Sequence, residues 1–320
     1  MAEGGGVIRI EPTSDGALQR PEPTGCGVVA ATSPIQPSER PGWMRAKAVA
    51  PDVYEGMKGT LSGLHTVCES AHCPNLGECW KRGTATFMIL GDVCTRSCRF
   101  CAIKTGRPEA VDLDEPRRLG EAARQMNLRH VVITMVARDE LDDGGAEQVG
   151  ACVQAVYDRV PSCSVEVLTS DFKGRWESIE TVLAAGPKIF NHNLETVERL
   201  TRQVRVQARY GRSLDVLRMA FEINPEIPTK SGIMLGLGEE IEEVVETLED
   251  MRRVGVSVVT LGQYLRPTQQ HLPVQRWVTP EEFAWLKIEA QKMGFCHIES
   301  GPLVRSSYHA EESVDQPLVV

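Results

Sequence analysis

Three cysteines stand within eight residues of one another in the stretch CTRSCRFC. Three residues separate Cys94 from Cys98, two separate Cys98 from Cys101, and Phe100 precedes the last cysteine. Thiolates are the usual ligands of iron–sulfur clusters, and a [4Fe–4S] cluster normally takes four of them. Three thiolates would therefore leave one iron open, as a Lewis acid able to bind a small molecule.

A second group of three cysteines lies upstream, in CESAHCPNLGEC. Cys68, Cys73 and Cys79 again supply three thiolates among Gly, Pro and Asn residues, a composition typical of an irregular segment ordered by a ligand. The other cysteines lack such spacing and are expected to be buried or incidental thiols; they are Cys26, Cys152, Cys163 and Cys296.

Zinc is the alternative occupant of both sites, because zinc also binds closely spaced cysteines. A zinc ion at the downstream cysteines would need a fourth ligand such as His72 or His192. At the upstream cysteines His65 or His72 would complete the site. The spacing by itself leaves these alternatives open.

Composition narrows the class of protein. The 320 residues are 42% hydrophobic, which is enough for one large domain, and the formal net charge is −9. We find no basic run typical of a nucleic-acid or membrane surface, and no apolar run near the ~20 residues that span a bilayer. The N-terminus lacks the apolar stretch of a signal peptide. We therefore expect a cytoplasmic protein without nucleic-acid or membrane partners, whose clustered cysteines bind metal rather than form disulfides.

Short apolar runs alternate with longer amphipathic ones from residue 84 onward. The expected strands cover residues 86–91, 130–137, 164–169, 188–195, 230–237, 257–264 and 296–300. The expected helices cover residues 114–127, 145–159, 175–184, 212–222, 239–254 and 280–293. Repeated strand and helix predict an α/β fold with parallel strands. Both a Rossmann-type sheet and a β/α barrel fit. Polar residues after nearly every strand, without a Gly-x-Gly-x-x-Gly after the first, favour the barrel.

The downstream cysteines and Phe100 resemble the radical S-adenosylmethionine (SAM) superfamily. The resemblance implies a partial (β/α)6 TIM-type barrel in which Cys94, Cys98 and Cys101 hold a [4Fe–4S] cluster. It implies that the amino and carboxylate groups of SAM bind the open iron. One electron then cleaves SAM to methionine and a 5′-deoxyadenosyl radical.

From about residue 40 to 310 the chain resembles one family of that superfamily, the lipoyl synthases. CPNLGECW, GQYLRPT and GPLVRSSYHA carry this resemblance. It implies that Cys68, Cys73 and Cys79 hold an auxiliary [4Fe–4S] cluster whose fourth ligand is Ser307, with Ser306 the neighbouring possibility. A serine oxygen is a poorer partner for cluster iron than a thiolate, so it can leave readily.

The resemblance also implies a reaction and its partners. Two sulfur atoms from the auxiliary cluster would enter C6 and C8 of an octanoyl chain on a lysine of a lipoyl-carrier domain. That carrier would be the E2 subunit of a 2-oxoacid dehydrogenase or the glycine cleavage H protein, and ferredoxin or flavodoxin would supply electrons. The alternatives are a radical SAM paralogue with another acyl or sulfur-insertion substrate and a non-catalytic iron–sulfur protein.

Residues near the strand ends are expected to contact SAM. By resemblance these are Phe100, Thr134, Arg138, Asp139, Asn193 and Gly236. The chain departs from the usual residues of the family in the same region, at Met135, Ala137 and Ser170. These departures leave the cysteines untouched.

The expected organisation has four parts. Residues 1–45 form a flexible or wrapping N-terminal arm, and residues 46–83 bind the auxiliary cluster. Residues 84–300 form the radical SAM barrel, and residues 301–320 form a C-terminal tail that carries the serine ligand.

Overall fold

The structure is a computed structural model that describes residues 40–44, 63–67, 73, 75–308 and 310–313. The main sheet of this part of the chain has eight strands in the order β1-β2-β5-β6-β7-β8-β9-β10. Its strands are β1 (His65–Thr66), β2 (Thr84–Ile89), β5 (His130–Met135), β6 (Ser164–Leu168), β7 (Ile189–Asn191), β8 (Thr229–Leu235), β9 (Val258–Gln263) and β10 (His297–Gly301). A separate two-stranded sheet pairs β3 (Val93–Cys94) with β4 (Lys104–Thr105).

From β2 to β10 the strands of the main sheet are parallel, and each pairs with the next main-sheet strand along the chain. Only β1 runs antiparallel, on the free side of β2. A Rossmann-type sheet reverses its strand order at a switch point, whereas continuous winding in one direction is the topology of a β/α barrel. Since β1 and β10 end the sheet without pairing to each other, the prediction of a partial barrel is confirmed.

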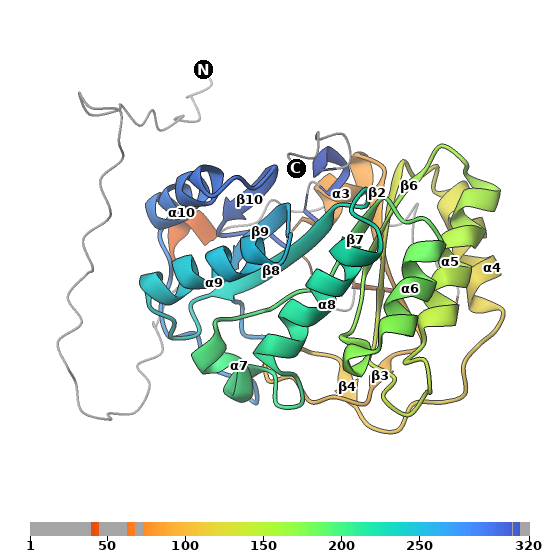
Figure 1. Ribbon diagram of the computed structural model, residues 1–320, viewed down its shortest axis with the longest axis horizontal. Coiled ribbons are helices and arrows are strands. Elements are labelled where there is room, and N and C mark those ends of the chain that lie inside the picture. The colour runs from red at the N-terminus through yellow and green to blue at the C-terminus, as the bar shows by residue number, and fades with distance from the viewer. Residues whose placement is uncertain (1–39, 45–62, 68–72, 74, 309, 314–320) are drawn as a thin grey trace, which may run out of the picture.

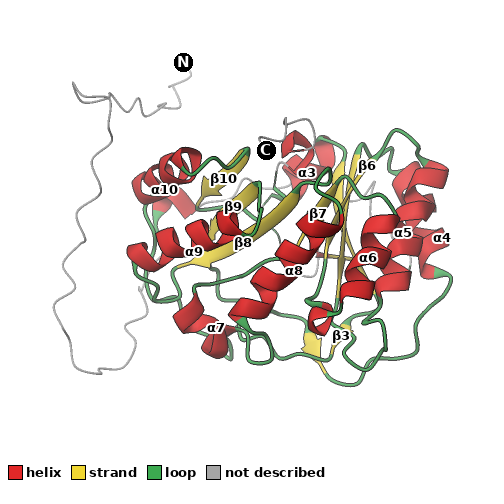
Figure 2. Cartoon of the chain, viewed as in Figure 1, coloured by secondary structure: helices red, strands yellow, loops and turns green. Residues whose placement is uncertain are grey.

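Helices cover the outer face of the curved sheet (Figures 1 and 2). They are α4 (Glu115–Gln125), α5 (Ala146–Arg159), α6 (Trp176–Ala184), α8 (Tyr210–Ile223), α9 (Ile241–Arg253) and α10 (Pro280–Lys292). Two shorter helices lie toward the ends of the strands, α3 (Leu76–Lys81) near the start of β2 and α7 (Glu198–Val204) on the carboxyl side (Figure 1). Short 3-10 turns are η1 (Gly42–Met44), η3 (Phe172–Gly174) and η4 (Ala310–Ser313).

Local sequence explains where the regular helices begin. The α10 helix starts with Thr279, whose hydroxyl accepts from the Glu282 N–H while the Glu282 side chain accepts from the Thr279 N–H. This reciprocal cap satisfies two N–H groups that a helix start otherwise leaves unpaired. The α9 helix has the same arrangement between Glu240 and Glu243. The predicted helices at 239–254 and 280–293 are thereby confirmed.

Several short elements were not predicted. The strand expected at 188–195 is regular only over β7, and Glu195 makes an isolated bridge to Ile233. The helices α3 and α7 and the strands β1, β3 and β4 are too short to give a periodic signal. The predicted N-terminal arm lies outside the described residues except for residues 40–44.

Candidate active site

The loop that carries the downstream cysteines follows β2 at the carboxyl end of the barrel strands. Cys94 ends β3, and the parallel pairing of Cys94 with Thr105 joins the two ends of the loop. The Gly106 N–H also donates to the Cys94 carbonyl at 3.0 Å. Figure 1 shows β3 and β4 beyond the carboxyl end of the sheet, on the same side as α7. All three thiols therefore belong to one closed loop.

Hydrogen bonds fix this loop to the segments after β5 and β9 and to the end of α7. The Thr95 N–H and hydroxyl both donate to the Ala137 carbonyl after β5, at 3.1 and 2.9 Å. The Arg99 N–H donates to the carbonyl of Val204 at the end of α7, at 2.8 Å. The Arg99 carbonyl accepts from the Leu272 N–H after β9 at 3.2 Å. Residues distant in sequence therefore hold the loop across the barrel mouth.

The surroundings of the thiols fit a group that carries positive charge. The Cys94 sulfur accepts from the N–H groups of Arg96 and Ala137, at 3.4 and 3.3 Å. Burial, together with the charges of the neighbouring cysteines, raises the pKa of Cys98 to about 12 and that of Cys101 to about 11. Three thiolates so close together repel one another, and cluster iron would remove that repulsion by binding each of them.

A single metal ion fits less well. In the part of the chain that the structure describes, no three His, Cys, Asp or Glu side chains converge as one ion requires. In a [4Fe–4S] cluster each cysteine binds a different iron, so the required arrangement differs. His192, suggested as a zinc ligand, is buried and has both ring nitrogens engaged, by the Thr169 carbonyl at 2.9 Å and the Ser213 hydroxyl at 3.0 Å. His72 lies outside the described residues.

A buried arginine joins the cysteine loop to two carboxylates, a feature that the sequence analysis missed. Arg96 donates to both oxygens of Asp139, at 2.7 and 2.8 Å, and to Asp171 at 2.6 Å. Burial would raise the pKa of Asp171, but the Arg96 guanidinium outweighs it and holds that pKa well below its usual range. The only sequence signals were an arginine between ligand cysteines and an aspartate just after a strand.

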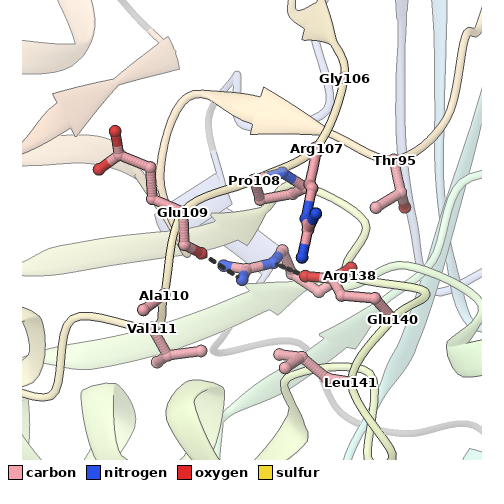
Figure 3. A pocket seen from close by; sticks show the side chains of 10 residues that line it. All are labelled: Thr95, Gly106, Arg107, Pro108, Glu109, Ala110, Val111, Arg138, Glu140 and Leu141. Carbon is pink, nitrogen blue, oxygen red and sulfur yellow. Dashed lines mark hydrogen bonds and ion pairs between the residues drawn. The ribbon is translucent and has the colours of Figure 1, made fainter.

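Arg138 and Asp139, the expected contacts of the SAM methionyl end, already have protein partners. Both Asp139 oxygens accept from Arg96. The buried Arg138 donates to the carbonyls of Leu90 and Glu109, at 3.0 and 2.6 Å, and pairs with Glu140 at 2.6 Å. Figure 3 shows this guanidinium between Glu109 and Glu140 on the wall of a surface pocket of about 750 Å³. Their contact with SAM stays a prediction.

The other expected SAM contacts lie along neighbouring strands. Thr134 is half-buried near the end of β5 and donates to the Leu168 carbonyl at 3.1 Å. Asn193 donates to Glu195 at 3.1 Å, whereas its buried Oδ1 has no hydrogen-bond partner in the described part of the chain. An orphaned acceptor is costly inside a protein and marks a place for a donor from a ligand. Phe100 is half-buried against the core formed by β8 to β10.

Gly236 and Glu195 both have backbone angles that few residues adopt. Gly236 has a φ of +95°, and a Cβ there would lie 2.1 Å from Gln263 Nε2. The side of Gly236 where a side chain would stand is therefore filled by the protein itself. Glu195 has a φ of +67°, a strained value for a glutamate, and such strain concentrates at functional sites.

The C-terminal tail lies beside the upstream cysteines. Asn75, two residues after Cys73, donates to the Leu303 carbonyl at 2.8 Å. Tyr308 donates to Glu78 at 3.4 Å, and its pKa is raised to about 12 by burial and by the charges of Glu78 and Cys79. These contacts join residues about 230 positions apart in sequence.

Ser306 and Ser307 lie on this stretch of the tail, between Arg305 and Tyr308, and both are half-buried. Burial raises the pKa of Cys73, against the opposing charge of Arg305. The tail residues on either side of the serines thus reach the segment of Cys73 and Cys79. Cys68, the third predicted ligand, lies outside the described residues.

Comparisons with known proteins agree with this geometry. The family model described as the radical SAM superfamily matches residues 88–251. A maturase of the [FeFe]-hydrogenase has a TM-score of 0.53 at 16% identity, over 79% of this chain and 68% of that one. Methylornithine synthase has a TM-score of 0.51 at 13% identity, over 79% of each chain. The fold and the cysteine loop therefore define a radical SAM protein, a class that uses SAM and a [4Fe–4S] cluster.

Curated relatives define the family within that class. The lipoyl synthase of Rubrobacter xylanophilus is 58% identical over 278 residues, which cover 86% of this chain and 87% of the relative. The lipoyl synthase of Koribacter versatilis is 53% identical over 291 residues, 89% and 96% of the two chains. The chain belongs to the lipoyl synthase family. The predicted family and enzyme class, a radical SAM sulfurtransferase, are confirmed.

Among the described residues, no helix has both the length and the apolar composition that a membrane span requires.

Proposed function

We propose that this protein inserts two sulfur atoms, at C6 and C8, into an octanoyl chain attached to a lysine of a lipoyl-carrier protein. Family membership supports the substrate class, and one structural observation carries the sulfur source. Residues on both sides of Ser306 and Ser307 contact the segment that holds Cys73 and Cys79. A serine there can complete a second set of three cysteine ligands.

Within this proposal the cysteine loop binds the cluster that SAM requires. Cys94, Cys98 and Cys101 would hold this cluster, and SAM would complete the site. When bound, the cluster and SAM would supply a radical that abstracts a hydrogen atom from an unactivated carbon. No side-chain base could remove that hydrogen as a proton. The ion pairs of Arg96 with Asp139 and Asp171 keep the loop in place over the barrel mouth.

The remaining roles extend the same proposal. Cys68, Cys73, Cys79 and Ser307 would bind the auxiliary [4Fe–4S] cluster, with Ser306 as the alternative fourth ligand. The proposed SAM contacts remain Phe100, Thr134, Arg138, Asp139, Asn193 and Gly236. The carrier would be an E2 subunit of a 2-oxoacid dehydrogenase or the glycine cleavage H protein, the electron donor ferredoxin or flavodoxin, and the compartment the cytoplasm.

Iron content and product analysis test the proposal together. After anaerobic reconstitution we expect about eight irons per chain in the wild type and about four when Cys68, Cys73 and Cys79 are all alanine. That variant should still cleave SAM but add no sulfur to an octanoyl-lysine peptide. Cys296→Ala, which removes a thiol outside both groups, serves as the control and should keep all irons and activity. About four irons in every protein, or zinc at the upstream cysteines, would remove the proposed sulfur donor.

The serine assignment needs a separate comparison. Ser307→Ala should abolish sulfur insertion while retaining SAM cleavage, and Ser306→Ala should retain both. The opposite pattern would transfer the ligand role to Ser306, and two fully active variants would contradict a serine ligand.

A further inference from the structure

The C-terminal tail crosses between the two ends of the open sheet. It leaves β10 at Gly301 and first packs against β9. A Cβ on Gly262 would lie only 2.3 Å from the Val304 carbonyl oxygen, so glycine allows this close approach. Arg305 then donates to the Gln263 carbonyl at 3.4 Å. The first anchor of the tail is therefore the β9 side of the sheet.

The second anchor lies at the start of β2, on the other side of the sheet. Arg82 Nε pairs with Glu311 Oε1 at 2.5 Å, and Arg82 also pairs with Glu312. The Thr84 hydroxyl donates to the second oxygen of Glu311 at 3.1 Å. Ala310 is completely buried, and Figure 1 shows η4 beside α3. We call the contacts of Arg82 and Thr84 with Glu311 and Glu312 the tail latch.

The electrostatics of the latch are those of a genuine ion pair. Burial would raise the pKa of Glu311, but a backbone hydrogen bond and the charge of Arg82 outweigh it, and the pKa falls below its usual value. The carboxylate is therefore ionised at neutral pH. The latch joins residues 227 to 230 positions apart, so it does not follow from local helix geometry.

The serines lie on the short span between these anchors. Only six residues separate Val304 from Glu311, and Ser306 and Ser307 are among them. Fixing both ends of a short span raises the local concentration of any group on it. This matters for a serine, because its oxygen is a weak partner for cluster iron and gains most from being held in place.

We infer that Arg82 and Glu311 are positioning residues that hold the ligand serine against the auxiliary cysteines. The inference rests on the proposed function, because it requires a serine ligand. The latch is made by the side chains of Arg82, Thr84, Glu311 and Glu312, so it acts on the ligand serine through the tail. Holding the tail at β2 also links the two ends of a sheet that no strand pairing closes.

The test isolates the auxiliary cluster. In a full-length background with Cys94, Cys98 and Cys101 changed to alanine, the rate of iron release to a chelator and the electron paramagnetic resonance spectrum of the reduced cluster are measured. Glu311→Gln and Arg82→Gln are compared with the unmodified background. Glu289→Gln, which removes the ion pair with Lys292 on α10, is the matched control. Circular dichroism checks that each protein is folded.

We expect about fivefold faster iron release in both latch variants, the effect of losing a partly exposed ion pair. Their spectra should shift toward that of the serine variant that loses the ligand. The double variant should release iron more slowly than the product of the two single effects predicts, because both residues act through one contact. The control should match the background.

The other outcomes separate the latch from the proposed function. If Ser307→Ala or Ser306→Ala alters the spectrum but both latch variants leave rate and spectrum unchanged, the serine ligand stands and the latch is overturned. If neither serine variant alters the spectrum, the serine ligand fails and the latch has nothing to position. Should Arg82→Gln fail to fold, Thr84→Val, which removes one hydrogen bond to Glu311, gives the same comparison.

Discussion

Replacing Lys230 by methionine should destabilise the barrel strongly. Lys230 on β8 and Glu166 on β6 are 1% and 0% exposed, and their Nζ and Oε2 atoms lie 2.9 Å apart. The other Glu166 oxygen accepts from Asn191 on β7 at 2.8 Å. Without Lys230 the Glu166 carboxylate would keep a single neutral donor in a site shielded from water. Removing one member of such a pair costs about 3–5 kcal/mol.

Most of that cost comes from the stranded charge rather than from the lost attraction. A pair of buried charges loses its hydration on folding, so the intact pair adds little net stability. The double variant Lys230→Met/Glu166→Gln removes both charges and keeps an acceptor for Asn191. It should therefore recover most of the stability, with a coupling energy of at least about 2 kcal/mol.

Thermal unfolding of the anaerobic proteins provides the assay. At about 2 °C for each kcal/mol in a chain of this size, Lys230→Met should lower the midpoint by about 6–10 °C. Lys292→Met is the matched control, because the Lys292 side chain is 64% exposed and its pair with Glu289 contributes less than about 1 kcal/mol. A Lys230→Met midpoint close to that of the control, or a double variant as unstable as the single one, would refute the argument.

Three further perturbations test other parts of the structure. Burial lowers the pKa of His130 from 6.5 to about 3, so between pH 6.5 and about 3 the imidazole is protonated in the unfolded chain but not in the folded one. Stability should fall by about 1.4 kcal/mol for each pH unit below about 6.5, and His130→Gln should flatten that slope in urea titrations at pH 7 and 5. Gly236→Ala should lower the free energy of unfolding by more than about 1 kcal/mol in the same titrations, because the added Cβ would meet the Gln263 side chain. An unchanged urea midpoint would contradict the close approach of Gln263 to Gly236. A lysine at position 96 cannot bridge the Asp139 and Asp171 carboxylates, so Arg96→Lys should lower the free energy of unfolding by about 2–3 kcal/mol. The variant should also lose iron faster from the cysteine loop; iron retention equal to that of the wild type would contradict the role of these ion pairs.

The grouping of the three cysteines in this loop was accessible from sequence because it is local. Cys94, Cys98 and Cys101 fall within eight residues, so their spacing alone limits what they can bind together. The strand and helix alternation was equally clear, since burial on both faces makes parallel strands apolar throughout. In β2, for example, all six residues are buried.

The partners of the polar residues could not be predicted in this way. Sequence analysis gave no sign that Lys230 and Glu166 face each other across β7. Their pairing depends on the order and register of the strands, because a register shift of one residue would turn either side chain to the opposite face of the sheet. Likewise, sequence analysis did not foresee the protein partners of Arg138 and Asp139, whose contact with SAM stays a prediction.

By itself, then, the sequence determined that two groups of closely spaced cysteines are present and that strands and helices alternate as in a barrel, because both features depend on neighbours along the chain. Only the tertiary structure placed the serine-bearing tail against the upstream cysteines and tied it to Arg82. Those contacts span about 230 residues, and the tail can make them because continuous winding of the strands leaves the sheet open between β10 and β1.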